Sequence, residues 1–152
     1  MQGKQRQMMG SMLDDYLKSE DITVRVLVEN IKIMSTTNVN NPNLVPTIIM
    51  LLDYCIRHQS NALFIRFHHR YHNYFDINSI DLYSNNDTLL IKATKENSKV
   101  IVQYLLDKGA DPNKRNIYGN TAMHYAVSYN YYIIADILRK NGARKILKML
   151  KD

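Results

Sequence analysis

The chain has 152 residues, of which 45% are apolar and 22% charged, values typical of one globular domain with a buried core. Its single cysteine, Cys55, excludes an internal disulfide framework and indicates a reducing compartment. No apolar run approaches the roughly 20 residues that a membrane-spanning helix needs. We therefore expect a cytoplasmic location, with the nucleus as an alternative. The basic N-terminus lacks the amphipathic arginine pattern of a mitochondrial presequence, so that location is disfavoured.

The net charge of +6 is concentrated in the second half of the chain. Residues 1–78 contain eight Lys and Arg against seven Asp and Glu, and residues 79–152 contain twelve against seven. The two halves therefore carry net charges of +1 and +5. Any attraction of an anionic partner is expected in the second half.

The front of the chain predicts a tail and a helical cap. Residues 1–11 are expected to form a flexible N-terminal tail. Residues 12–44 are expected to form an N-terminal helical cap and a loop, because apolar residues recur at helical spacing and Ser19 and Asp21 could cap a second helix. The polar stretch 35–43 is rich in turn residues and predicts the loop. A separate small helical domain is the alternative for this front half.

Residues 45–80 are expected to form a degenerate repeat. A long apolar helix has Pro46 in its first turn, and a second helix follows from the stretch NALFIRFHHRYHNY. The next turn contains Asn78, which lies 35 positions before Asn113 in a similar turn downstream. The repeats downstream are related by 33 residues. The spacing of 35 therefore indicates two extra residues in the hairpin that follows Asn78.

Residues 81–113 and 114–143 match each other at a fixed offset of 33 residues, which indicates a repeat array. Thr88 and Thr121 begin equivalent short helices, because a threonine hydroxyl can accept from the free N–H groups of a first turn. An asparagine that tolerates left-handed angles ends each short helix, and a glycine ends the amphipathic helix that follows. The matching pairs are Asn97/Asn130, Ile101/Ile134, Leu105/Leu138 and Gly109/Gly142.

Two motifs in this region resemble a known family. TAMHYA, at 121–126, resembles the T-P-L-H-x-A signature of ankyrin repeats, and LLDKGADPN, at 105–113, resembles the family's L-L-x-x-G-A-D-x-N. The resemblance covers residues 81–143. It departs from the family where Leu89 and Ala122 replace a proline, and where Ile91 replaces a histidine.

The resemblance implies an all-α fold, an ankyrin-repeat α-solenoid of helix-turn-helix repeats with projecting hairpin turns. It also implies that Gly119 lies in a hairpin turn and that His124 is structural, bonding the Thr121 hydroxyl and the neighbouring backbone. The alternative, His124 as a general base, lacks the motifs of a nucleophile and an orienting carboxylate.

The end of the chain, residues 144–152, is expected to form a basic C-terminal capping helix with an apolar stripe along one side. A capping role alone and a further role in binding nucleic acid, anionic lipid or an acidic protein remain open. The stripe consists of Ile146, Leu147, Met149 and Leu150, and the basic patch of Arg139, Lys140, Arg144, Lys145, Lys148 and Lys151.

The segment RFHHRYH, residues 66–72, contains the strongest candidates for metal or RNA binding. His68 and His72 lie four positions apart and could begin a zinc site, but no motif supplies further ligands, so we expect no metal. Arginines that alternate with aromatic residues are also compatible with RNA stacking, although ordinary amphipathicity gives the same pattern. The residues in question are Arg66, Phe67, Arg70, Tyr71 and Tyr74.

No motif of an enzyme is present. Cys55 lies in an apolar helix and is expected to be a buried small hydrophobe, and no glycine-rich phosphate loop occurs, so we expect neither catalysis nor a cofactor.

The resemblance implies a non-catalytic protein–protein interaction module, an adaptor or scaffold that is monomeric on its own. The partner is expected to be another protein, bound on the concave or hairpin face through tip residues and exposed positions of the inner helices. A nucleic-acid or ribonucleoprotein-associated scaffold and a structural subunit of a larger assembly are the alternatives. The expected contacts are Ser84, Asn85, Asp87, Lys92, Lys95, Glu96, Ile117, Tyr118, Asn120, Tyr125, Ser128 and Tyr129.

Overall fold

The computed structural model describes residues 21–146, which divide into two compact units at Leu51 and Leu52. In the first unit, helix α2 (Ile22–Thr37) begins after Asp21. The Asp21 carboxylate accepts hydrogen bonds from the backbone N–H groups of Thr23 and Val24, at 3.1 and 3.4 Å. The predicted cap at Asp21 is therefore confirmed, whereas Ser19 lies outside the described residues.

Helix α2 extends to Thr37, so the expectation of a loop beginning at residue 35 was wrong. The hydroxyl groups of Ser35 and Thr36 donate to the carbonyl of Lys32, and the hydroxyl of Thr37 donates to the carbonyl of Ile33. These bonds satisfy the polar side chains within the helix, which lets residues that favour turns continue it. The loop itself covers residues 38–43.

Helix α3 (Leu44–Arg57) contains Pro46 in its first turn, as predicted, and the boundary between the two units falls within it. The second unit continues with α4 (Asn61–Tyr71) and the short 3-10 helix η1 (His72–Tyr74). A two-stranded antiparallel ribbon of β1 (Ile80–Asp81) and β2 (Asp87–Thr88) then leads into the matching repeats.

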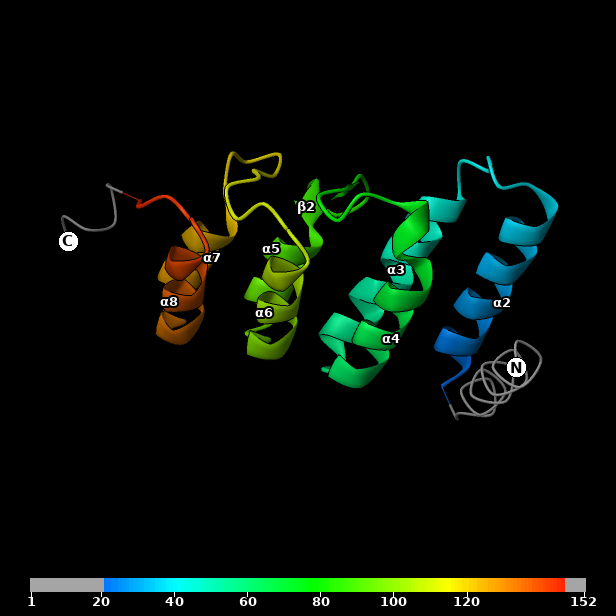
Figure 1. Cartoon of the computed structure of the whole chain (residues 1–152), viewed down its shortest axis with the longest axis horizontal. Helices are drawn as coiled ribbons and strands as arrows, with labels where there is room; N and C mark the ends of the chain where they lie inside the picture. Colours follow the sequence, from blue (N-terminus) through cyan, green and yellow to red (C-terminus); the bar gives the residue numbers. More distant parts are fainter. Residues whose placement is uncertain (1–20, 147–152) are drawn as a thin grey trace. The chain divides into compact units, whose positions relative to one another are not determined.

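The matching repeats form two helix pairs, α5 (Leu89–Lys95) with α6 (Lys99–Asp107) and α7 (Ala122–Ser128) with α8 (Tyr132–Lys140). Helix α5 packs on α6 and α7, while α8 packs on α6 and α7, and α6 also contacts α4 (Figure 1). The hairpin loops project from one edge of this stack. The all-α repeat architecture expected from the sequence is thus confirmed.

The two helix pairs begin and end at equivalent residues. Thr88 caps α5, where its hydroxyl accepts from the N–H of Ile91 at 3.2 Å, and Thr121 is the N-cap of α7. The residues that end the helices have positive φ: 53° at Asn97, 60° at Asn130, 93° at Gly109 and 95° at Gly142. These angles are the left-handed conformations predicted from the 33-residue offset.

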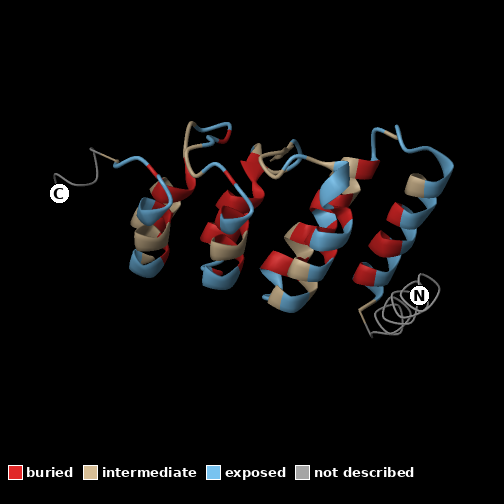
Figure 2. Ribbon diagram, in the orientation of Figure 1, coloured by how far each residue is buried: buried red, intermediate tan, exposed pale blue. Residues whose placement is uncertain are grey.

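The core of the stack consists of aliphatic side chains on the facing sides of the helices. Figure 2 shows buried residues concentrated in these helices and exposed residues along the projecting loops. The fully buried side chains include Leu89 and Ile91 of α5, Ile101 and Leu105 of α6, and Ile134 of α8. Burial of each such side chain contributes roughly 1.5 to 3 kcal/mol.

Asparagine side chains join the turn of each repeat to the next turn. The side-chain oxygen of Asn78 accepts from the N–H of Asp111 at 2.8 Å. In the following repeat, the side-chain oxygen of Asn113 accepts from the N–H of Arg144 at 2.9 Å, and its amide donates to the carbonyl of Gly142 at 3.0 Å. Asp111 and Arg144 are 33 residues apart, so the same joint, a hydrogen bond from a backbone N–H to the asparagine side chain of the preceding turn, is made twice.

The expected C-terminal helix is described only in part. Residues 144–146 are not helical, and the remainder of the predicted helix, residues 147–152, lies outside the described residues. In the part of the chain that the structure describes, no helix combines the length and the apolar character needed to cross a bilayer.

Candidate functional site

Large apolar side chains are exposed at the tips of two successive hairpins. The exposed fractions are 72% for Leu82, 83% for Tyr83, 64% for Ile117 and 67% for Tyr118. Exposed apolar residues that gather at one edge of a protein are typical of an interaction site.

The two tips are fixed to each other by hydrogen bonds. The backbone N–H of Ile117 donates to the carbonyl of Asn85 at 2.9 Å, and the Tyr118 hydroxyl donates to the Asn85 side-chain oxygen at 3.3 Å. The buried side chain of Asn116 accepts from the N–H groups of Tyr118 and Asn120, both at 3.1 Å. The second tip is therefore held both from within and from the preceding hairpin.

A polar network lies beneath the tips. One carboxylate oxygen of Asp87 accepts from the Asn116 amide at 2.9 Å, and the other contacts the Lys95 ammonium group at 2.6 Å. The Asn116 amide also donates to the Tyr125 hydroxyl at 2.8 Å, and the Lys95 ammonium group lies 4.5 Å from the centre of the Tyr125 ring. Asp87 is only 2% exposed, so the expectation that it contacts a partner was wrong. Its carboxylate is used to connect two repeats.

Lys92 is also buried, at 5% exposure, and its assignment to the partner-binding surface was wrong as well. Its ammonium group lies 3.2 Å from a carboxylate oxygen of Asp53 and 3.0 Å from one of Asp81. A lysine between two carboxylates can remain charged in a buried position. This side of α5 faces the preceding repeat, which places the lysine inside the stack.

The other expected contact residues are at least partly accessible. Their accessibility permits partner binding without testing it. Asn85, Glu96, Ile117, Tyr118, Ser128 and Tyr129 are exposed, whereas Ser84, Lys95, Asn120 and Tyr125 are half-buried.

Two tip residues, Leu82 and Tyr83, were missed by the sequence analysis. An offset of 33 residues, counted back from Ile117 and Tyr118, leads to Ser84 and Asn85. An offset of 35, taken from the preceding turn at Asn78, leads to Leu82 and Tyr83. The first hairpin contains two extra residues before Thr88. Its tip therefore matches the second tip at the offset of 35 that relates Asn78 to Asn113, and not at the offset of 33 that relates Thr88 to Thr121.

His124 has the structural role that the resemblance implies. Its Nδ1 accepts from the backbone N–H of Thr121 at 2.9 Å and lies 2.9 Å from the Thr121 hydroxyl oxygen. The ring thus joins the start of α7 to its first turn.

The structure separates the described members of the basic patch into two groups. Arg139 and Lys140 form ion pairs with Asp136 at 2.6 and 3.0 Å, and hydrogen bonds from these two residues lower the pKa of the Asp136 carboxyl group. Arg144 and Lys145 form no ion pair within the described residues. Lys148 and Lys151 lie outside that part of the chain.

The histidine-rich helix does not bring metal ligands together. His68 is buried, with its Nδ1 2.9 Å from the Tyr104 hydroxyl, whereas His72 is exposed and contacts the carbonyl of His69. Across residues 21–146, no group of three or more His, Cys, Asp or Glu side chains could hold a metal ion.

The RNA-stacking interpretation of this helix fails for two of its aromatic residues. Phe67 and Tyr71 are buried and therefore offer no ring face to a base. Cys55 is buried too, as expected for a small hydrophobic side chain.

His68 should make the stability of the protein depend on pH. Burial lowers the pKa of His68 from 6.5 to about 4, and the charges of His72, Lys108 and His69 act in the same direction. Between these pH values the unfolded state binds more protons than the folded state, so stability should decrease as pH falls from 6.5 towards 4.

This dependence can be measured as the urea midpoint at several pH values. His68→Leu should flatten the profile in that window, while His69→Leu, which removes only the smallest of these charge effects, should keep most of its slope. Equal slopes in the wild type and His68→Leu would contradict the assignment.

Comparison with known proteins identifies the family. The family described as "Ankyrin repeats (3 copies)" matches residues 18–149, which is most of the chain. The chain belongs to the ankyrin-repeat family. Ankyrin repeats generally mediate protein–protein interactions and are typically non-catalytic.

Viral ankyrin repeat proteins are similar to this chain over part of their length. R664 of Acanthamoeba polyphaga mimivirus is 39% identical over 80 residues, which are 51% of this chain and 49% of R664. FPV233 of Fowlpox virus (strain NVSL) is 46% identical over 48 residues, which are 32% of this chain and 9% of FPV233. The chain thus spans half or less of the length of these curated relatives.

A solved structure shares the ankyrin-repeat fold. It is a chain of the complex of the predatory endopeptidase Bd0816 from Bdellovibrio bacteriovorus with the immunity protein Bd3460. The similarity has a TM-score of 0.55 at 28% sequence identity and covers 61% of this chain and 46% of that chain.

Proposed function

We propose that this ankyrin-repeat chain is a non-catalytic adaptor or scaffold in the cytoplasm that binds a partner protein through its hairpin tips. The observation that carries the proposal is the exposed set of Leu82, Tyr83, Ile117 and Tyr118 on two tips joined by hydrogen bonds. Tyrosine provides a large amphipathic contact with few rotatable bonds and is enriched in binding hot spots. The solved complex of an endopeptidase with an immunity protein is a protein–protein assembly and is consistent with this mode.

The surrounding hydrogen bonds support the proposal because they reduce the cost of binding. A tip that is already fixed loses little conformational entropy when a partner docks. Lys95 of α5 and Tyr125 of α7 belong to the polar network beneath the tips, and the Tyr129 ring, at the end of α7, lies 6.0 Å from the Tyr125 ring. The accessible parts of these side chains extend the proposed surface.

The first experiment is an affinity capture with mass spectrometry, performed with and without nuclease, to identify the partner. Tyr118→Ala should then weaken binding about tenfold, because truncation of a central hot-spot tyrosine typically costs more than 1 kcal/mol. The circular dichroism spectrum should stay unchanged, since Tyr118 is exposed.

Val100→Ala provides the matched control, because Val100 is 51% exposed on the outer helix α6. Its affinity should equal that of the wild type. Loss of binding in Val100→Ala with full binding in Tyr118→Ala would show that the outer face, not the tip edge, is the interface.

A further inference from the structure

A basic hollow of about 290 Å³ lies beside the second hairpin. Arg115, Arg144 and Lys145 line it, together with Thr121 and His124. All three cationic residues are exposed, and within residues 21–146 none of them forms an ion pair. The hollow therefore combines three positive charges that no described carboxylate neutralises.

His124, which lines the hollow, can act as a neutral donor. Because its Nδ1 accepts from the N–H of Thr121, the neutral ring carries its proton on Nε2. That Nε2–H group has no hydrogen-bond partner in the described part of the chain. Burial, and then the charge of Arg115, lowers the pKa of His124, which favours the neutral ring.

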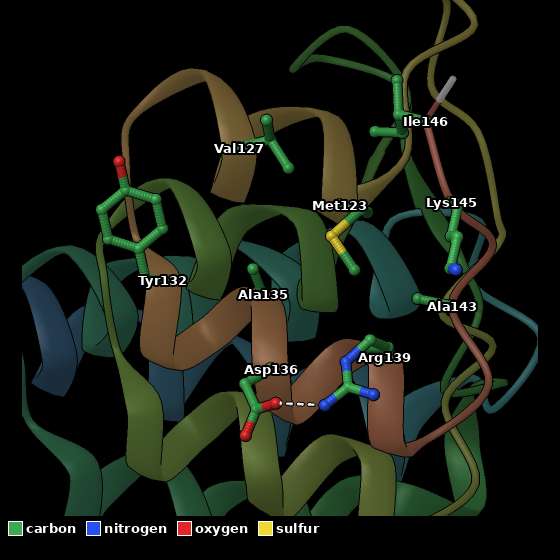
Figure 3. A pocket seen from close by; sticks show the side chains of 9 residues that line it. All are labelled: Met123, Val127, Tyr132, Ala135, Asp136, Arg139, Ala143, Lys145 and Ile146. Carbon is green, nitrogen blue, oxygen red and sulfur yellow. Dashed lines mark hydrogen bonds and ion pairs between the residues drawn. The ribbon is translucent and has the colours of Figure 1, made fainter. Parts of the chain in front are cut away.

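Among the described residues, the positive charges of α8 do not extend the hollow into a continuous basic track. Arg139 and Lys140 are paired with Asp136, and the Arg139–Asp136 pair lies at the edge of an adjoining apolar groove of about 350 Å³ (Figure 3). Lys145 and Ile146 line both the groove and the hollow. A nucleic-acid backbone is bound by a continuous series of cations, whereas a local charge cluster beside an apolar groove fits one anionic side chain of a peptide.

We propose that this hollow binds a phosphorylated serine or threonine side chain of the partner protein. The inference rests on the proposed function, since it specifies one chemical feature of that partner. A phosphate group carries a charge of about −1.5 to −2 at pH 7 and three acceptor oxygens, which matches three cations and a ring N–H better than a single carboxylate does. Guanidinium groups bind two such oxygens at once in a fork geometry.

The test uses the full chain and follows the His124 ring signals by NMR. The probes are free O-phosphoserine and inorganic phosphate, with acetate as the carboxylate and sodium chloride at equal ionic strength as the control. Both phosphates should shift the His124 signals saturably. They should also raise the pKa of His124, because the bound negative charge offsets that of Arg115.

Variants locate the binding site. Arg115→Gln and Arg144→Gln should each weaken phosphoserine binding about tenfold, the usual effect of losing one charge-assisted hydrogen bond. Lys140→Gln is the matched control, since it removes a positive charge that is already paired with Asp136. Tyr118→Ala should bind phosphoserine like the wild type, which separates this site from the proposed protein-binding tips.

Several outcomes would overturn the inference. These are the absence of a saturable shift beyond that of chloride, acetate binding as tight as phosphoserine binding, and equal losses in Lys140→Gln and Arg115→Gln. Tighter binding of a single-stranded oligonucleotide than of phosphoserine, lost in Arg144→Gln, would assign the hollow to nucleic acid instead. If phosphoserine fails to bind while Tyr118→Ala still loses the captured partner, the proposed function stands without this inference.

Discussion

Lys92→Met should lower the free energy of unfolding by about 3 kcal/mol, because it removes the positive charge from a buried ion-pair group. The Lys92 ammonium group lies between carboxylates of Asp53 and Asp81, and all three side chains are mostly shielded from water. Asp53 keeps an ion pair with Arg57 at 3.1 Å, so the loss falls mainly on Asp81. Urea unfolding at pH 7 measures the change.

Two further variants separate charge from packing. In Lys92→Met/Asp53→Asn/Asp81→Asn, only Arg57 loses a carboxylate partner, and its side chain is 58% exposed. No unpaired charge remains buried, so most of the lost stability should return. Lys99→Met, at an exposed position of α6, should change stability by less than about 0.5 kcal/mol. A triple variant as unstable as the single one would mean that the lysine stem acts through packing instead.

Gly109→Val should destabilise the protein by about 1 to 3 kcal/mol through backbone strain. Gly109 has a φ of 93°, in the region that disfavours any side chain and β-branched ones most. An added Cβ would meet no atom within 4 Å, so the cost comes from the backbone and not from a clash. Thermal unfolding should show a clear decrease in Tm.

The control is Gly109→Asn, which has the same backbone requirement but the side chain that best tolerates left-handed angles. It should cost less than Gly109→Val. An unchanged Tm in Gly109→Val would show that residue 109 does not need its left-handed conformation in solution.

The parts of the fold that depend on local backbone chemistry could be predicted from the sequence. The caps at Thr88 and Thr121 and the left-handed positions at Asn97 and Gly109 follow from residue type and a fixed offset. The end of α2 could not be predicted in this way. Its last residues favour turns by type, yet they continue the helix with their hydroxyl groups bonded to carbonyl groups of the preceding turn. The proposed repeat boundaries stay a prediction.

Residues of the candidate site that are exposed at a turn could be predicted from the sequence. Residues that are buried by partners far away in the sequence could not. Ile117 and Tyr118 are exposed beside a glycine turn, as expected. The burial of Lys92 and Asp87 could not be predicted from the sequence, because their partners, Asp53 and Asn116, lie 39 and 29 positions away in other repeats.

The joints between turns have a consequence for the evolution of the surface. In each joint the acceptor is an asparagine side chain, and the donor is a backbone N–H that every residue except proline possesses. The donating residue is an acid in one repeat, Asp111, and a base in the next, Arg144. The joint itself therefore imposes no charge at this position, although the Asp111 side chain also accepts from the N–H of Asn113 at 2.8 Å. Mutation can invert the electrostatic sign of the hairpin edge, one repeat at a time, while the bonds that hold the repeats in register persist.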